Sequence, residues 1–257
     1  MRATWHSGGQ KSREFFHQHL PRLKDAKVPW LSRPLSEEQL RALVFDPNDA
    51  QAALAHAYDF GSWHALAAFV DLLEQRDDAV WPFENAVDAV VDGDLATLQR
   101  LLAGRPSLVH ERSRRVTHFD PPVHAATLLH YVAANGTEGY RQRTPPNAVA
   151  IAQALLHAGA DPDALAHLYG GECTTLALLV SSCHPAQAGL QVALVDLLVA
   201  HGATIGNKGE GNWISPIETA LIFGYRNAAE ALERHGAKLT LAGAAGLGRV
   251  EVVEQLL

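Results

Sequence analysis

Residues 126–136 read ATLLHYVAANG, and residues 151–161 read IAQALLHAGAD. Each segment predicts a short apolar helix, because leucines and alanines recur at the three- and four-residue spacing of one helical face. Gly136 closes the first helix, and Gly159 fits a left-handed residue just past the second, a position that favours glycine. The two segments therefore predict a pair of helices joined by a turn.

The same pairing recurs along the chain. Glycines 93, 136, 224 and 248 end the first helix of a pair, and Cys183 stands at the equivalent place of the third pair. We predict five units, and they start near Glu84, Thr127, Thr174, Ser215 and Leu239. Their second helices hold apolar residues expected to form the core between units: Leu98, Leu101, Leu102, Ile151, Leu155, Leu156, Leu194, Leu197, Leu198, Leu232, Val250, Val253 and Leu257. Glycines 159, 202 and 236 are expected to adopt left-handed conformations after these helices.

These segments resemble the ankyrin repeat, whose signature runs T-P-L-H-x-A and, after a second helix, L-L-x-x-G-A. Here Leu128 replaces the signature proline and Val132 the first signature alanine. Residues 127–136, 139–148 and 169–175 look like one bacterial ankyrin subfamily, which supplies no catalytic residues to transfer. The resemblance implies an all-α fold with an ankyrin-repeat solenoid over residues 79–257, in about five units of which the last is incomplete.

Residues 1–78 predict a small helical domain before the array. Ser36 and Gln39 form a capping box for a helix over 37–44, and Asp46-Pro47 starts another that Gly61 ends. Residues 49–66 resemble the leader that precedes the repeats of many bacterial ankyrin proteins. We expect this domain to cap the array, because a first repeat otherwise presents an apolar face to water. An independent binding domain is the alternative.

The composition fits a folded protein of 257 residues, with 47% apolar and 19% charged residues. A net charge of −7 gives no general attraction to nucleic acid or anionic lipid. No apolar run is long enough to span a bilayer, and the first 30 residues are too polar for a secretory signal, so we expect a cytoplasmic protein. Cys173 and Cys183 lack metal-pair spacing and are expected to be reduced and inert.

The last unit stops at residues 254–257, before the Gly-Ala pair that closes the other units. This end leaves Val253, Leu256 and Leu257 without a following unit to cover them. Terminal repeats normally carry a polar outer face, so we expect the native chain to continue or a partner to cover this end.

Four loops are longer than the ankyrin pattern requires, over residues 112–124, 137–147, 166–172 and 184–189. Such loops lie along one side of a repeat stack and often bind other molecules. Arginine and aromatic side chains are the types that dominate interfaces. The candidate partner-binding residues are Arg112, Arg115, Phe119, Tyr140, Arg141, Tyr169 and Trp213. In the alternative interpretation, Glu111 and Asp120 balance the arginines in a solvated loop, and the aromatic residues pack beneath their own loops.

The sequence shows no nucleophile elbow, phosphate-binding loop or zincin motif. His118, His124 and His130 are spaced six apart, which does not place them on one helical face, so we predict no metal site and no cofactor. His130 stands at the signature histidine of the repeat, where a structural hydrogen bond to the neighbouring turn explains it.

We therefore predict a protein–protein interaction module that binds an unknown protein partner through the concave, loop-bearing side of the array. We expect a monomer that is not an enzyme and binds neither nucleic acid nor membrane. The alternative is an enzyme or enzyme subunit, with His118, His124 and Tyr140 in a pocket of the expanded second and third units. A third possibility is a structural array fused to a further module.

Overall fold

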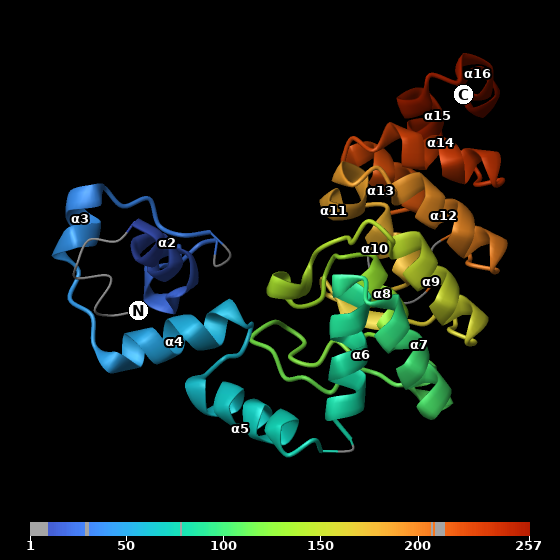
Figure 1. Cartoon of the computed structure of the whole chain (residues 1–257). Coiled ribbons are helices and arrows are strands. Elements are labelled where there is room, and N and C mark those ends of the chain that lie inside the picture. The colour runs from blue at the N-terminus through green and yellow to red at the C-terminus, as the bar shows by residue number, and fades with distance from the viewer. Residues whose placement is uncertain (1–9, 29–30, 78, 207, 209–213) are drawn as a thin grey trace. The chain divides into compact units, whose positions relative to one another are not determined.

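The computed structural model describes residues 10–28, 31–77, 79–206, 208 and 214–257. The chain is mostly helical (Figure 1), as the sequence predicts, and one short hairpin forms the only sheet in the described ranges. It divides into two compact units. The first runs to Gln75 and also includes Val116–Phe119, and the second comprises Arg76–Arg115 and Asp120–Leu257. The boundary predicted from the sequence lies at residue 78, and that prediction includes Val116–Phe119 in the array.

The helices of the first unit begin at caps that the sequence indicates. Both hydrogen bonds of the Ser36–Gln39 capping box are present, and Asp46 accepts from the Asp49 N–H at 2.9 Å. Two small apolar clusters form its core, around Phe16 and around Phe60. The helices are α2 (Gln10–His19), η1 (Pro21–Leu23), α3 (Glu37–Ala42), α4 (Pro47–Ala57) and α5 (Trp63–Glu74).

A left-handed residue follows α4, but it is Asp59, with φ of 62°, rather than the predicted Gly61. The Asp59 carbonyl accepts a hydrogen bond from the His118 N–H at 2.9 Å. The His118 ring lies 4.5 Å from the ring of His56, measured between centroids. These contacts bring Val116–Phe119 into the first unit. Burial, together with the charge of His118, lowers the pKa of His56 to about 4.

The second unit is a stack of helix pairs in two rows, with each helix in contact with the next in its row (Figure 1). The first helices of the pairs are α6 (Trp81–Asp92), α8 (Leu128–Val132), α10 (Thr175–Leu179), α13 (Pro216–Ile222) and α15 (Leu241–Leu247). The second helices are α7 (Leu95–Gly104), α9 (Ala148–His157), α12 (Gln191–Ala200) and α14 (Arg226–Arg234), and α16 (Val250–Leu256) packs on α15.

One continuous apolar core runs through this stack from Phe83 to Leu247. Most of the leucines and the isoleucine predicted in the second helices α7, α9, α12 and α14 are buried there, whereas Leu101 and Leu197 are partly buried and pack against the core. The final helix α16 differs, because none of its residues is buried and Val250 and Leu257 are exposed. No helix in the described residues has the length and apolar character needed to cross a membrane.

The signature histidine makes the predicted structural bond. His130 Nδ1 accepts from the Thr127 N–H at 3.1 Å, so the ring proton stands on Nε2 and is donated to the Cys173 carbonyl at 3.2 Å. His130 is fully buried, and burial lowers its pKa to about 4. The bond links the second helix pair to the chain that enters the third.

Residues between the helices form short additional elements. They are η2 (Pro106–His110), η3 (Gly139–Arg141), α11 (Cys183–Gln187) and an antiparallel hairpin of β1 (Ala166–Leu168) and β2 (Gly171–Cys173). Glycines 159, 202 and 236 are left-handed, as predicted, with φ of 97°, 90° and 90°. Cys183 was expected to end the first helix of its pair. It begins α11 instead, where Pro185 fits the first turn because that turn needs no N–H donor.

Candidate functional site

The expanded loop over 137–147 is attached to α6 by charged side chains. Glu84, Asp88 and Asp92 are four residues apart and form one stripe along this helix. Arg141 Nη1 donates to Glu84 Oε2 at 2.6 Å, and its Nη2 donates to Asp88 Oδ1 at 2.8 Å. Arg143 Nε donates to Asp92 Oδ1 at 3.1 Å. The loop therefore presents two arginines to three carboxylates.

A second carboxylate joins this arrangement from the loop itself. Glu138 Oε1 lies 3.1 Å from His124 Nε2 and 3.6 Å from Arg115 Nε. The Ala126 N–H donates to His124 Nδ1 at 3.1 Å, so Nε2 carries a proton and donates it to Glu138. We call Glu84, Arg115, His124, Glu138 and Arg141 the buried charge cluster, because each is at most 3% exposed.

The two carboxylates of the cluster respond differently to their surroundings. Burial by itself raises the pKa of Glu138, but the hydrogen bond from His124 and the charges of His124, Arg141 and Arg115 lower it to about 2. Burial raises the pKa of Glu84, while its 2.6 Å contact with Arg141 favours the ionised carboxylate. Although burial lowers the pKa of Arg141, the charge of Glu84 raises it well above its usual value. The cluster thus contains paired ions.

Arg115 and Arg141 were predicted on exposed loop tips, and this placement is wrong. Arg115 is 2% exposed and Arg141 is 3% exposed, because carboxylates of α6 and of the loop compensate their charges inside the protein. Neither guanidinium is available to another molecule in this conformation. Their partners in the structure are residues of the same chain.

Tyr140 lies over the cluster. Arg115 Nη1 donates to its hydroxyl at 2.8 Å, and the guanidinium carbons of Arg115 and Arg141 lie 5.2 and 5.3 Å from its ring centre. Tyr140 is still 36% exposed. It is therefore fixed by the cluster on one side and open to solvent on the other.

Arg112 connects two loops of the second unit. Its Nη1 donates to the Ala125 carbonyl at 2.9 Å and also to the Leu165 carbonyl. Phe119 is 42% exposed, and its ring lies 4.3 Å from that of His118 in the first unit. Trp213 lies outside the described residues.

Tyr169 occupies the turn of the hairpin, with φ of 55°, and is 64% exposed. Its hydroxyl donates to Asn135 Oδ1 at 2.6 Å, just beyond the end of α8. Asn135 Nδ2 in turn donates to the Leu178 carbonyl at 3.0 Å. The ring also passes over Gly136, where a Cβ atom would lie 3.2 Å from it. Tyr169 is thus held in one orientation while much of its surface faces solvent.

Ile222 and Phe223 lie at the end of α13, in the place that Ala134 and Asn135 occupy after α8. They are 71% and 56% exposed, and the Phe223 ring is nearly parallel to that of Tyr225 at 6.5 Å between centroids. We call Tyr169, Ile222 and Phe223 the exposed ridge. Ile222 and Phe223 are not among the partner-binding residues predicted from the sequence. Ile222-Phe223-Gly224 aligns with Ala134-Asn135-Gly136, and this replacement of small or polar residues by large apolar ones was a readable signal.

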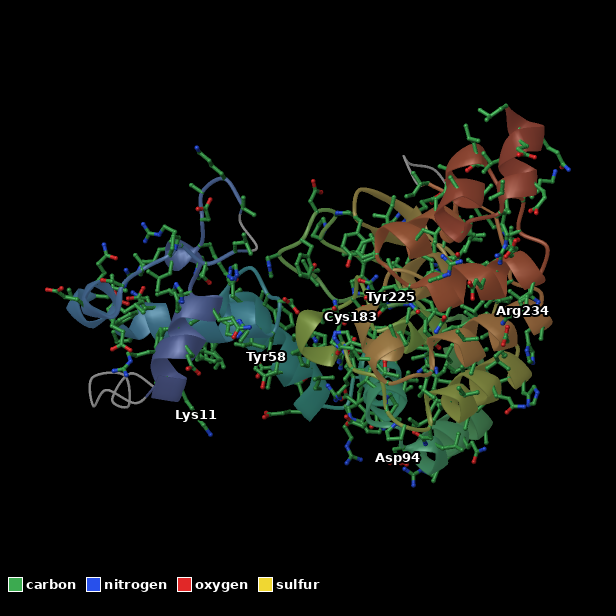
Figure 2. All side chains as sticks on the ribbon, turned by 90° about the horizontal axis from the view of Figure 1, so that it is seen from above. Lys11, Tyr58, Asp94, Cys183, Tyr225 and Arg234 are labelled. Atoms are coloured by element: carbon green, nitrogen blue, oxygen red, sulfur yellow. The ribbon has the colours of Figure 1, made fainter. Side chains whose placement is uncertain are left out.

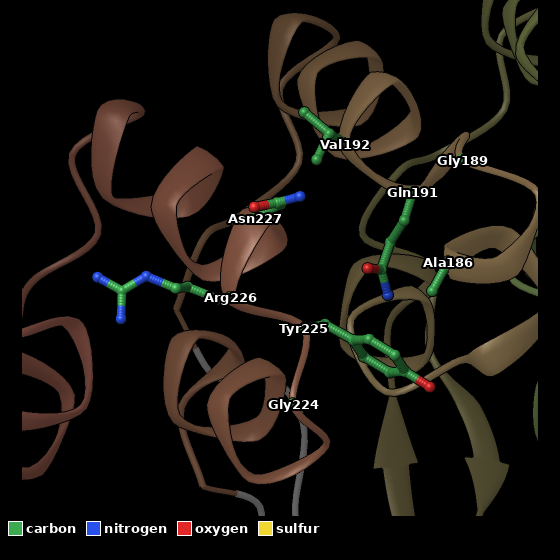
Figure 3. A pocket seen from close by; sticks show the side chains of 8 residues that line it. All are labelled: Ala186, Gly189, Gln191, Val192, Gly224, Tyr225, Arg226 and Asn227. Carbon is green, nitrogen blue, oxygen red and sulfur yellow. The ribbon is translucent and has the colours of Figure 1, made fainter.

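A hollow of about 250 Å³ lies between the turn after α11 and the turn before α14 (Figure 3). Gln191, Tyr225 and Asn227 line it, together with Ala186, Val192 and the glycines of both turns. Gln191 Nε2 is used within the chain, since it donates to the Leu179 carbonyl at 2.9 Å. The described lining includes Tyr225 and Arg226 but no carboxylate, histidine or cysteine.

The remaining candidates for chemistry do not assemble. His124 belongs to the buried charge cluster and Tyr140 contacts it, whereas His118 contacts His56 in the first unit. No group of three or more metal-ligating side chains occurs in the described part of the chain. Burial raises the pKa of Cys173 to about 12, which keeps its thiol protonated. Cys183 is exposed and lies close enough to Tyr225 to contribute, after burial, to its raised pKa (Figure 2).

No protein-family model matches the sequence, and a comparison with curated proteins finds no match. The resemblance to ankyrin repeats rests on the residues themselves.

Proposed function

We propose that this chain is a protein-binding module of the ankyrin-repeat type, which holds a partner against the loop-bearing side of its helix stack. The observation that carries the proposal is the exposed ridge. Three large side chains are exposed here, Tyr169 on the turn of the hairpin and Ile222 and Phe223 at the end of α13, where a solvent-facing surface gains nothing from them. Their rigid support is the continuous core of the second unit.

The ankyrin assignment is supported by three features of the second unit. Its helices alternate between two rows, left-handed glycines close its second helices, and His130 joins one pair to the next. In such an array the helices supply stability and the loops supply specificity. Residues 10–75 are proposed to cap the first repeat.

The proposed partner is a protein rather than a nucleic acid, because the chain carries a net charge of −7. Tyr140 and Tyr169 remain from the residues of the second unit that were predicted to bind it, and Ile222 and Phe223 join them. Phe119 is also exposed but belongs to the first unit. Arg112, Arg115 and Arg141 are assigned to holding the loops in place.

The test compares capture of proteins from the native lysate by three versions of the chain. One is native, one carries Tyr169→Ala and Phe223→Ala, and the control carries Val250→Ala, which removes an equally exposed apolar side chain from α16. Loss of both ridge anchors is expected to weaken binding by about 30-fold or more, as anchor residues each contribute on the order of 1–2 kcal/mol or more. Circular dichroism confirms that each variant folds.

A protein retained by the native chain and the control, and lost by the ridge variant, supports the proposal. Equal capture by all three versions contradicts the choice of ridge. Failure of the native chain to retain any protein contradicts the proposed function itself.

A further inference from the structure

Two histidines meet at the ends of neighbouring helices in the second unit. His157 is the last residue of α9, and His201 follows the last residue of α12. The two helices pack against each other in the same row (Figure 1). The ring centres of the two histidines are 5.6 Å apart, with 49° between the ring planes. His157 is exposed and His201 is half-buried, so the pair is open to solvent on one side.

The hydrogen bonding of His201 leaves one ring nitrogen ready to bind a cation. Its Nδ1 lies 2.9 Å from the Leu197 carbonyl, which can only accept, so Nδ1 carries the proton. The lone pair of the neutral ring therefore stands on Nε2. A backbone carbonyl that fixes the tautomer and orientation of a histidine in this way is the usual outer support of a metal ligand.

The distance between the rings also suits a shared metal ion. Imidazole nitrogen binds Zn²⁺ at about 2.0–2.1 Å, and with the size of the ring this places two ligating rings roughly 5–6 Å apart between centres in a tetrahedral site. The observed 5.6 Å falls in this range. His157 is exposed, which leaves its ring room to turn one of its nitrogens toward the same point.

We propose that His157 and His201 form a binding site for a divalent late transition-metal ion, such as Zn²⁺ or Ni²⁺, with water in the remaining positions. Water is required because no third protein ligand stands near the pair among the residues that the structure describes. The next histidine along this edge, His235, is engaged by Asp196 at 2.7 Å and lies outside the site. A metal ion there joins the second helix pair to the third.

The chemistry of the site predicts its selectivity. Two neutral imidazoles favour the late first-row ions, in the order Cu²⁺ above Ni²⁺ above Co²⁺, and disfavour Mg²⁺ and Ca²⁺, which need oxygen ligands. The ion binds only the folded chain, because only the folded state brings the two histidines together. The melting temperature of the chain is therefore expected to rise as the free ion concentration increases.

The test uses the untagged full chain titrated with ZnCl₂ and NiCl₂ by isothermal titration calorimetry, with MgCl₂ as a reference ion. His157→Ala and His201→Ala are the test variants. His167→Ala is the matched control, because it removes another exposed histidine, from the hairpin. The expected result is saturable binding by the native chain and the control, with affinity on the order of tenfold or more weaker in either test variant.

Absence of saturable Zn²⁺ and Ni²⁺ binding by the native chain overturns the proposal, as does unchanged affinity in the two test variants. A direct readout covers the case in which a variant does not fold. In the native chain, Zn²⁺ must shift the imidazole NMR signals of His157 and His201 while that of His167 stays in place, and any other pattern overturns the site.

Discussion

Two contacts between helix pairs of the second unit depend on different interactions, ion pairs in one and apolar packing in the other. Between the first and second pairs, the loop over 137–147 reaches α6 through ions, with Arg141 on Glu84 and Asp88. Between the third and fourth pairs, α12 and α14 meet through buried Val195, Leu232 and their apolar neighbours. No buried ion pair occurs at that second contact within the described ranges.

The difference follows from the composition of the loop. Residues 137–147 contain no leucine, isoleucine, valine, methionine or phenylalanine, so the loop has little apolar surface with which to attach itself. Ions replace that surface, and they make the contact sensitive to the loss of any one partner, because an unpaired buried charge is unfavourable. The apolar contact between α12 and α14 does not require each side chain to be paired with a particular partner, and it leaves a hollow beside Tyr225.

The largest effect is expected from Arg141→Ala. This change leaves Glu84 buried without its strongest positive neighbour, and it also removes a positive charge 4.0 Å from the buried Glu138. Breaking a buried ion pair from one side lowers the free energy of unfolding by about 3–5 kcal/mol. Urea unfolding followed by circular dichroism measures it, and a loss below about 1 kcal/mol means that the loop is held by something other than its charges.

Glu138→Gln tests the same contact through pH. The folded-state pKa of Glu138 is about 2, below the usual 4.5, so its ionised form stabilises the fold above pH 4.5 and this contribution is lost as the pH falls toward 2. The native chain is expected to exceed the variant in unfolding free energy by on the order of 3 kcal/mol at pH 7. Urea titrations at pH 7, 5, 4 and 3 measure the difference, which must shrink below pH 4.5. A difference that does not change with pH contradicts the role given to this carboxylate.

Much of the local structure could be predicted from the sequence, because its causes are local. The caps at Ser36 and Asp46 and the left-handed glycines depend on residues within a few positions of one another. The bond from His130 to the next unit was predictable because the repeat pattern itself carries it. The buried leucines follow from helical periodicity in the same way.

The candidate site was harder to predict from the sequence, because its ion pairs join residues that are far apart in the chain. Arg141 pairs with Glu84, 57 residues away, and an arginine in a polar loop is expected to face water. The spacing of Glu84, Asp88 and Asp92 was visible as a stripe, but nothing in the sequence says which cation meets it. The strands β1 and β2 have three residues each, too few for alternation to be recognised.

Gly136→Ala is expected to have an intermediate effect and compares the second helix pair with the fourth. Gly136 has φ of 77°, and an added Cβ would lie 3.0 Å from Leu168 and 3.2 Å from Tyr169. Gly224 has φ of 80° and no atom within 4 Å of such a Cβ. Both substitutions impose backbone strain, on the order of 1–2 kcal/mol, but only Gly136→Ala also displaces Tyr169.

Thermal and urea unfolding of the two alanine variants measure this comparison. Gly136→Ala must be the less stable of the two, and it must also change the near-ultraviolet circular dichroism, to which Tyr169 contributes. Equal stability of the two variants contradicts the packing of Tyr169 over the end of α8.

The smallest effect on stability is expected from Arg143→Ala, two residues along the chain from Arg141. Arg143 donates to Asp92 as Arg141 does to Asp88, and both arginines belong to the same loop. The side chains of Arg143 and Asp92 are 45% and 57% exposed, so water solvates either one when the other is removed. Arg143→Ala should therefore lower the free energy of unfolding by about 0–1 kcal/mol, and added salt should reduce even that. If Arg143→Ala and Arg141→Ala destabilise the chain equally, burial is not what distinguishes the two pairs, and the loop is held by the sum of its charges along the stripe of α6.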